Sequence, residues 1–522
     1  MDASETKPKH EQCLDTERQS IQHGDLDCLE GLNFQPEGTR KLTPLQTISA
    51  SWIICDSWAG VAATVALAVV QGGPVTLIYG LILIFFLVGA CTLTLAELAS
   101  TYPTAGGQYH WTSILAPKHL SRALSYCCGV SNMLAWIAIC TGIAIIPAQL
   151  ILGIVLFYNS EYQSQPWHYF LIYQSINGLV LLYNTTLLKK SLWFHDVSFF
   201  MTLTSFVIIM VTCLARSASR YEASSSVWAT FLDGSGWNSG GVAFLTGLVS
   251  PNYMYAGIDG ALHLAEECRN ATTAVPRALI STLVIGFVTS FAFMITMLYC
   301  TSDLDTVVAS STGVPIYEMW HQATRSTSAA TVFICLLLLA AVFALTGAQQ
   351  TASRLTWSLA RDRALIGSQW TGQLHDTLEV PVWALVFNYA VMFLIGCIYL
   401  GSSSAFNAFI GTGLVLQHIS YAFPAALLLY RCRSATWLPD PRPFRLPSPV
   451  GWGANLITVC FAVLVLIFYD FPTVMPVTGS NMNYTPAVLG AMAIVAGINW
   501  LVYARKWYQG PRLRRSSGEI QK

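Results

Sequence analysis

Long apolar segments joined by short polar stretches are the feature that most limits how this chain can fold. A helix of about 20 residues crosses roughly 30 Å of hydrocarbon, and twelve segments here are that long and that apolar. They take up more than half of the 522 residues, of which 54% are hydrophobic and 10% charged. The sequence therefore predicts an all-α membrane protein with twelve transmembrane helices. The predicted spans cover residues 44–69, 75–96, 123–157, 166–187, 192–215, 241–263, 277–300, 328–353, 381–400, 403–430, 451–471 and 485–503.

The Lys and Arg residues fall almost entirely into alternate gaps between these segments. If the N-terminus lies in the cytosol, 24 of the 27 basic residues lie in cytosolic segments. Only Arg216, Arg220 and Arg325 lie on the other side. Cytosolic loops of membrane proteins carry an excess of Lys and Arg, so the bias places both termini in the cytosol.

Composition also argues against several other classes of protein. The formal net charge is zero, so no nucleic-acid partner is expected. The 14 Cys residues lack the spacing of metal ligands, and no Gly-x-x-x-x-Gly-Lys-Ser/Thr motif for ATP is present. We find no cluster typical of a catalytic centre. The expected partners are therefore the lipid bilayer and a small-molecule substrate, with no metal, no cofactor and no enzymatic activity.

Two of the twelve segments are interrupted near their centres. The first contains Asp-Ser-Trp-Ala-Gly at 56–60, and the sixth contains Ser-Pro-Asn-Tyr at 250–253 and Ala-Gly-Ile-Asp-Gly at 256–260. Non-helical backbone at membrane depth is tolerated where protein buries it or where it lines an aqueous cavity. Either cluster alone could instead reflect close helix packing. Broken helices at corresponding places in two halves are typical of a transporter's central site. Here each interrupted segment is the first helix of one half in a possible five-plus-five arrangement, spans one to five and six to ten.

Three motifs lie around these segments. Glu-Leu-Ala-Ser-Thr-Tyr-Pro-Thr-Ala-Gly-Gly-Gln-Tyr-His-Trp occupies 97–111, Tyr-Ala-Gly-Ile-Asp begins at Tyr255 and runs to Glu-Glu at 266–267, and Ala-Arg-Asp-Arg occupies 360–363. They resemble motifs of the amino acid–polyamine–organocation permeases, over residues 44–503. The break at 57–60 looks most like the fungal branch with choline and γ-aminobutyrate permeases. The resemblance implies a leucine-transporter-like fold: a 5+5 inverted repeat with two extra C-terminal helices, and a site between spans one, three, six, eight and ten.

Both breaks are expected to contact the substrate, largely through backbone groups. A broken helix offers free N–H groups to a carboxylate and free C=O groups to an ammonium group. Tyr253 matches the position of an aromatic gate in related permeases, and its ring could hold a quaternary ammonium group. Trp136 either packs in the core or lines the cavity. The predicted substrate-binding residues are Asp56, Ser57, Trp58, Ala59 and Gly60 in the first break, and Ser250, Tyr253, Ala256 and Gly257 in the sixth segment.

Acids within or beside the membrane are candidates for coupling and gating, since an ionisable group at this depth is costly. Asp259 either takes up a proton or makes a structural hydrogen bond. Asp56 replaces the Asn usual in the resembled branch, and it could pair with a cationic substrate, carry the coupled proton or cap a half-helix. Glu266 and Glu267 are predicted to belong to an inner gate, paired with Arg269 or Arg277. No Lys or Arg lies in the interior of a span, so nothing matches the intramembrane Lys that replaces a sodium ion in some relatives. The proton is the favoured coupling ion, because protonatable acids lie along the expected path.

Together these features predict a secondary active transporter, a proton symporter for a small amino acid, choline or a related amine. An exporter, an exchanger or a nutrient sensor on the same fold are the alternatives. The plasma membrane is the expected location, with the vacuolar membrane as the alternative. The predicted domains are a disordered cytosolic tail over 1–43, a transporter domain over 44–503 and a basic cytosolic tail over 504–522.

Overall fold

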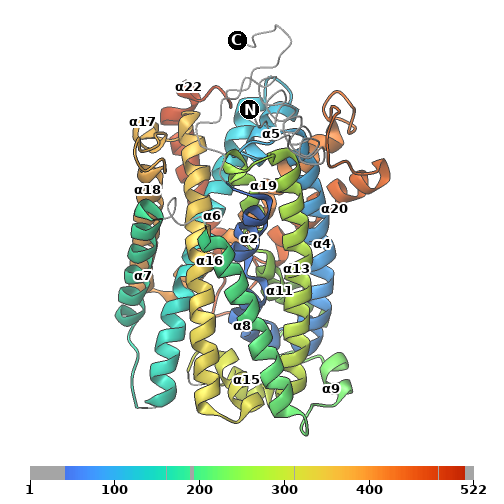
Figure 1. Cartoon of the computed structure of the whole chain (residues 1–522), viewed down its shortest axis with the longest axis vertical. Coiled ribbons are helices and arrows are strands. Elements are labelled where there is room, and N and C mark those ends of the chain that lie inside the picture. Colours follow the sequence, from blue (N-terminus) through green and yellow to red (C-terminus); the bar gives the residue numbers. More distant parts are fainter. Residues whose placement is uncertain (1–41, 160, 188–192, 311, 480, 512–522) are drawn as a thin grey trace, which may run out of the picture.

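The structure is a computed structural model and describes residues 42–159, 161–187, 193–310, 312–479 and 481–511. Long helices lie side by side along one axis of the molecule (Figure 1). The described residues form no β-strand and only two isolated bridges, Leu42–Cys268 and Gln71–Asp233. The prediction of an all-α membrane protein is confirmed to this extent.

The helices alternate between long ones and short connecting ones. In chain order they are α2 (Pro44–Cys55), α3 (Ser57–Val70), α4 (Gly73–Thr101), α5 (Gln108–Leu115), α6 (Ser121–Tyr158), α7 (Pro166–Thr186), α8 (Trp193–Ser217), α9 (Ser224–Ala229), α10 (Gly240–Gly247), α11 (Val249–Asn252), η2 (Tyr253–Tyr255), α12 (Gly260–His263), η3 (Ala265–Glu267), α13 (Ala271–Cys300), α14 (Leu304–Val308), α15 (Pro315–Thr324), α16 (Thr327–Arg361), α17 (Ser368–Thr371), α18 (Val382–Gly401), α19 (Ser403–Tyr430), α20 (Ser448–Phe468), α21 (Thr485–Asn499), η4 (Trp500–Ala504) and α22 (Arg505–Trp507).

Ten helical segments of the described chain are long and apolar enough to cross a membrane, with α2 and α3 counted together. They correspond to ten of the twelve predicted spans. The segment predicted over 166–187 forms the 21-residue helix α7 but is less apolar than the ten. The segment predicted over 241–263 is divided into α10, α11, η2 and α12, because its Pro and Gly residues interrupt the helical hydrogen bonds.

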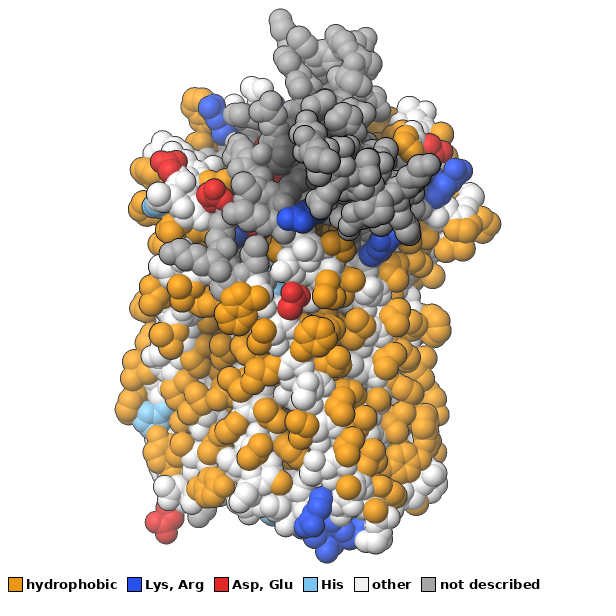
Figure 2. All heavy atoms as spheres, viewed as in Figure 1, with side chains coloured by type: hydrophobic (Ala, Val, Ile, Leu, Met, Phe, Trp, Pro, Cys, Tyr) orange, Lys and Arg blue, Asp and Glu red, His pale blue; other side chains and the backbone are white. Residues whose placement is uncertain are grey.

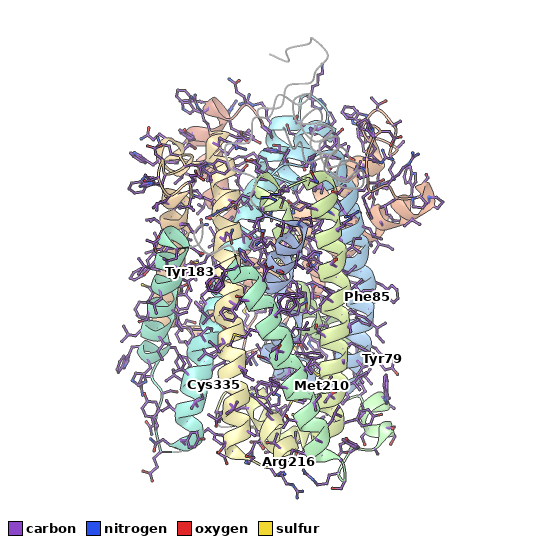
Figure 3. All side chains as sticks on the ribbon, in the orientation of Figure 1. Tyr79, Phe85, Tyr183, Met210, Arg216 and Cys335 are labelled. Carbon is purple, nitrogen blue, oxygen red and sulfur yellow. The ribbon has the colours of Figure 1, made fainter. Side chains whose placement is uncertain are left out.

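The outer surface of the bundle suits a lipid environment. Apolar side chains cover the middle of the visible face, and Lys and Arg gather toward the two ends (Figure 2). Tyr79 and Phe85 point outward from α4, and Arg216 lies at the end of the bundle near α15 (Figure 3). The helices α5, α17 and α22 lie at the opposite end (Figure 1). The loops therefore sort to the two ends as the alternation of basic residues predicts.

The broken segment 240–263 lies in the interior of the bundle. Its parts pack against α2, α3, α4, α13 and α16, and α6 packs along α16 and α19. Large aromatic side chains fill the space between these helices, and Trp52, Trp58 and Trp136 are each at most 1% exposed. Burial of such rings contributes several kcal/mol in water, but within lipid their close packing is what holds the helices together.

The predicted tails fall mostly outside the described residues. This holds for nearly all of the tail over 1–43 and for the last part of the tail over 504–522. The described start of the latter continues the last long helix through η4 and α22. Tyr508 is buried there, its hydroxyl lies against the Ser125 hydroxyl, and Arg122 Nε donates to its carbonyl at 2.9 Å. The basic tail therefore begins with a segment packed against α6.

Candidate substrate and proton site

The first predicted break is present and is confined to one residue. Asp56 separates α2 from α3 and has φ 32° and ψ 60°, in the left-handed region that L-residues rarely adopt. Its N–H still donates to Trp52 O at 2.8 Å, and its carbonyl accepts from the Gly60 N–H at 3.0 Å. Since α3 begins anew at Ser57, its first N–H groups have no carbonyl partner within their own helix.

The Asp56 carboxylate is buried and has no hydrogen-bond partner in the described part of the chain. The residue is 2% exposed, and neither carboxylate oxygen has a hydrogen-bond partner among the residues that the structure describes. The side chain does not cap α3, so the capping alternative is wrong. A buried charge is costly unless it is paired, and this carboxylate is therefore free to receive a cationic ligand or a proton.

The second break is longer and contains truly non-helical backbone. After η2 the chain runs through turns over 256–259 before α12 begins. Gly257 has φ +81°, and a Cβ there would lie 3.0 Å from both Ile54 Cγ2 and the Trp136 ring. Only glycine fits both the backbone conformation and the space. The sequence run at 250–260 therefore forms the predicted interruption.

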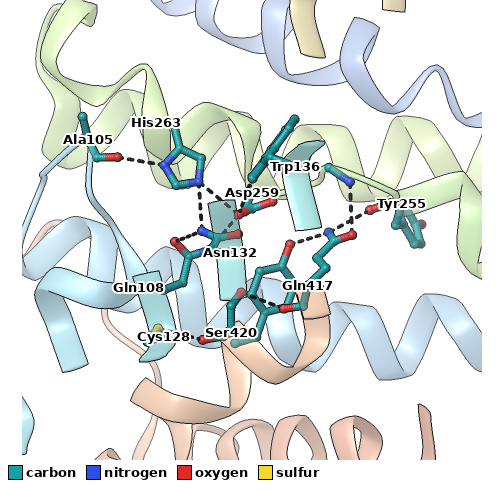
Figure 4. A network of polar contacts seen from close by, with 12 residues as sticks. Ala105, Gln108, Cys128, Asn132, Trp136, Tyr255, Asp259, His263, Gln417 and Ser420 are labelled. Atoms are coloured by element: carbon teal, nitrogen blue, oxygen red, sulfur yellow. Dashed lines mark hydrogen bonds and ion pairs between the residues drawn. The ribbon is translucent and has the colours of Figure 1, made fainter. Parts of the chain in front are cut away.

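The side-chain amide of Gln417, on α19, covers the peptide groups of this interruption (Figure 4). Gln417 Oε1 accepts from the Gly257 N–H at 3.4 Å, and Gln417 Nε2 donates to the Tyr255 carbonyl at 3.4 Å. Nε2 also donates to the Tyr421 hydroxyl at 2.5 Å. Sequence reasoning missed Gln417, although a Gln in the apolar run 403–430 was the signal that could have found it.

The two breaks touch each other. Ser57 Oγ donates to Met254 O at 2.6 Å, and a Cβ on Gly60 would lie 3.2 Å from the Tyr253 carbonyl. Below them, the hydroxyls of Thr64 and Ser250 lie 3.0 Å apart. The structure thus brings together predicted residues from the first and sixth segments that are almost two hundred positions apart.

Other predicted contacts have different surroundings. The Trp58 indole packs between α8 and α13, with ring centroids 6.4 Å from Phe206 and 5.5 Å from Phe293. The Trp58 ring therefore packs against these two helices. The two alanines are buried, Ala59 at 6% and Ala256 at 8% exposure. Tyr253 begins η2 and is partly exposed.

Asp259 lies in a dense polar network (Figure 4). Its Oδ2 accepts from Gln108 Nε2 at 2.7 Å and from Trp136 Nε1 at 3.3 Å, and it lies 3.2 Å from His263 Nε2. Trp136 therefore contacts the candidate site. Sequence reasoning gave no role to His263 or Gln108, although the first lies one helical turn after Asp259 and the second lies in the motif at 97–111.

Two ion pairs join the end of the broken segment to α16. Glu266 pairs with Arg361 at 3.3 Å, and Glu267 pairs with Arg354 at 2.7 Å. The predicted pairing with Arg269 or Arg277 is wrong, because α16 passes beside η3 and presents its arginines there. Arg269 forms a backbone hydrogen bond at this end of the segment: its N–H donates to Leu42 O at 3.0 Å.

Reversing the charges of the second pair tests whether it has a gating role. We expect Arg354→Glu alone to lower substrate uptake at least tenfold, because two carboxylates then face each other across the junction. The double variant Arg354→Glu/Glu267→Arg restores the attraction and should recover much of the loss, with the interaction measured as a double-mutant cycle. A double variant no better than the single one would mean that the pair has no role of its own in transport.

No group of three or more His, Cys, Asp or Glu side chains in the described chain is placed to hold a metal ion. The arrangement offers a buried carboxyl group at Asp56, peptide groups at two helix breaks and a polar network around Asp259. The bundle around them is that of a multi-pass membrane transporter.

Comparison with known proteins agrees with this class. The chain belongs to the amino acid permease family, which matches residues 45–494, within the amino acid–polyamine–organocation superfamily. It is therefore a transporter and not an enzyme. It is 31% identical over 454 residues to a choline transporter of Saccharomyces cerevisiae, covering 87% of this chain and 79% of the relative.

Two further relatives show the breadth of the family. A swainsonine transporter of Arthroderma benhamiae is 31% identical over 483 residues, covering 91% of this chain and 93% of the relative. The amino-acid permease BAT1 of Arabidopsis thaliana is 26% identical over 502 residues, covering 92% and 95%. The relatives thus carry chemically different small solutes.

Proposed function

We propose that the protein is a proton-coupled symporter that takes up a small organic cation, choline or a related amine, by alternating access. Small amino acids are the second substrate class. In this proposal the chain crosses the plasma membrane twelve times as a 5+5 inverted repeat with two extra helices, and both termini are cytosolic. The segment 240–263 and α7 supply the two crossings beyond the ten apolar helices.

The observation that carries the proposal is the buried carboxylate of Asp56 at the first break, to which the described residues offer no hydrogen bond. An anion held away from water attracts a cation more strongly than the same anion in solvent. An ammonium or quaternary ammonium group bound beside it would neutralise the charge, and an anionic solute would be repelled. The similarity to a choline transporter supports the same substrate class.

The second break supports a cationic substrate because it disfavours an anionic one. At the second break a substrate carboxylate would require free N–H groups, yet the Gly257 N–H there already donates to Gln417 Oε1. A carboxylate must displace this amide, whereas a cation beside Asp56 need not. The first N–H groups of α3 could serve a carboxylate, but they follow directly after Asp56, whose own carboxylate would repel it. Tyr253, which is partly exposed as a residue, has an aromatic ring of the kind that suits a quaternary ammonium group. In this proposal the Glu266 and Glu267 pairs supply the inner gate.

Uptake into proteoliposomes tests the proposal. Purified protein would be given radiolabelled choline, γ-aminobutyrate and a panel of neutral amino acids, with and without an inward proton gradient. We expect choline or another amine to accumulate when the gradient is present and only to equilibrate after a protonophore is added. Equal accumulation with and without the proton gradient would contradict proton coupling.

The same vesicles address the direction of transport. Vesicles preloaded with the amine would be placed in substrate-free buffer under the same gradient. We expect retention of the amine inside. Rapid loss of the amine into substrate-free buffer would favour the exporter. Loss that occurs only when amine is present outside would favour the exchanger.

A further inference from the structure

His263 has one ring nitrogen whose protonation state is fixed by its neighbour. The side chain is buried, and Nδ1 lies 2.8 Å from the Ala105 carbonyl oxygen (Figure 4). A carbonyl oxygen can only accept a hydrogen bond. Nδ1 therefore carries a proton, and any change of charge on this ring occurs at Nε2.

Nε2 faces two neighbours with opposite requirements. Asp259 Oδ2, an acceptor, lies 3.2 Å away, and Asn132 Nδ2, a donor, lies 3.3 Å away. The orientation of the Asn132 amide follows from the network, because its Nδ2 also donates to Gln108 Oε1 at 3.2 Å. Gln108 in turn must direct its Nε2 to the Asp259 carboxylate, at 2.7 Å. A single imidazole nitrogen cannot satisfy both neighbours at once.

Counting protons gives two states of this network. When a proton lies between Nε2 and Oδ2, His263 and Asp259 form a neutral pair, or an ion pair of zero net charge, and Asn132 keeps its bond to Gln108. When that proton leaves, Nε2 has a lone pair that accepts from Asn132 Nδ2. Asp259 is then an anion held by Gln108 and Trp136. Both states fill the hydrogen-bond requirements of Nε2, and they differ by one proton.

We infer that His263 and Asp259 together bind the coupled proton, and that His263 exchanges Asp259 for Asn132 as its partner when the proton is released. The inference rests on the proposed proton coupling and names the residues that perform it. Only one O–H or N–H bond forms and breaks: the proton arrives from one side of the membrane and leaves to the other. Because Asp259 belongs to the unwound backbone and Asn132 to α6, the exchange alters the contact between these two parts of the bundle.

Other ionisable groups surround the pair and belong to the same electrostatic environment. Cys55 beside the first break and His418 and Tyr421 on α19 are ionisable groups in the surroundings of Asp259. Asp56 lies next to Cys55, and η3 and α16 contribute paired charges of both signs. Those charges are Glu266, Glu267, Arg354 and Arg361. The test must therefore separate His263 from a general change of charge in the site.

The experiment compares wild type, His263→Gln and His195→Gln in proteoliposomes. Gln keeps polar atoms near the ring nitrogens but does not titrate. His195 is a matched control, a buried imidazole on α8 outside this network. For His263→Gln we expect at least a tenfold lower accumulation ratio under a proton gradient and an uptake rate that no longer varies with pH. Exchange of labelled for unlabelled choline at equal pH should persist, and His195→Gln should behave like wild type in both assays.

A second variant keeps the inference testable if His263→Gln is inactive. Asn132→Leu removes the donor that stabilises the deprotonated state, so the pair should hold its proton more firmly. Half-maximal uptake should then move to higher external pH by about one unit, the effect of one lost hydrogen bond.

Three results would overturn the inference. One is a His263→Gln protein that accumulates choline with the wild-type pH profile. Another is loss of both accumulation and exchange in His263→Gln together with an unmoved profile in Asn132→Leu, which would indicate a structural role. If wild type itself shows no gradient-driven accumulation, proton coupling as a whole fails, and this site fails with it.

Discussion

Replacing Asp56 with Asn should lower choline uptake about 100-fold while leaving the substrate-free protein at least as stable as wild type. Removing one member of a buried charge pair costs about 3 kcal/mol, which corresponds to about two factors of ten in affinity. The loss should appear as a higher KM for choline in uptake kinetics. Stability should not fall, because the carboxylate has no partner in the described protein and a neutral amide is cheaper to bury.

The combination of lower function and unchanged or higher stability is what distinguishes a binding role for Asp56 from a structural one. The measurements are uptake rates and the thermal midpoint of the detergent-solubilised protein without substrate. Asp196→Asn is the matched control, since Asp196 has a protein partner, Ser49 Oγ at 2.9 Å. Equal losses of choline and neutral amino-acid uptake in Asp56→Asn, or a clear fall in its thermal midpoint, would contradict the cation-partner role.

Glu97→Gln should destabilise the protein strongly. Glu97 is fully buried and faces two arginines: Arg433 Nη2 lies 2.5 Å from Oε2, and Arg442 Nε lies 3.7 Å from Oε1. The Leu446 N–H also donates to Oε1, at 3.2 Å. Taking away this negative charge leaves Arg433 buried without an acid among the described residues, and leaves Arg442 with Asp440 alone, at 3.9 Å. Uncovering a buried charge in this way costs about 3–5 kcal/mol.

The effect should be seen as a lower thermal midpoint in fluorescence-detected size exclusion and as less protein in the membrane. Glu161→Gln, which alters an exposed acid in a loop, should leave both unchanged. The Glu97→Gln protein that does fold should keep its KM, because Glu97 lies at the end of α4, away from both breaks. Wild-type stability in Glu97→Gln would show that the two arginines find other partners.

The interruptions of the two helices could be predicted from the sequence because their causes are local. Apolar length sets where a helix can cross, and Pro251, Gly257 and the Asp56 stretch interrupt helical hydrogen bonding wherever the rest of the chain lies. The structure confirms ten of the twelve predicted spans as long apolar helices. It also shows the interruptions where the sequence predicted them, at 56 and at 256–259.

The partners of the polar residues could not be predicted, because they come from distant parts of the chain. Local spacing favoured Arg269 or Arg277 for Glu266 and Glu267, yet α16 supplies the arginines, 95 and 87 positions away. Gln108 reaches Asp259 across 151 positions.

By itself, then, the sequence determined the membrane class, the order of the helices and the places where two of them break, since each follows from neighbouring residues. Tertiary structure alone decided which acids have hydrogen-bond partners. Helix packing brings a histidine, a tryptophan and a glutamine to Asp259, while it brings no hydrogen-bond donor to Asp56 within the described chain. A carboxylate's role depends on the groups a few ångströms away, and only the folded chain determines which groups those are.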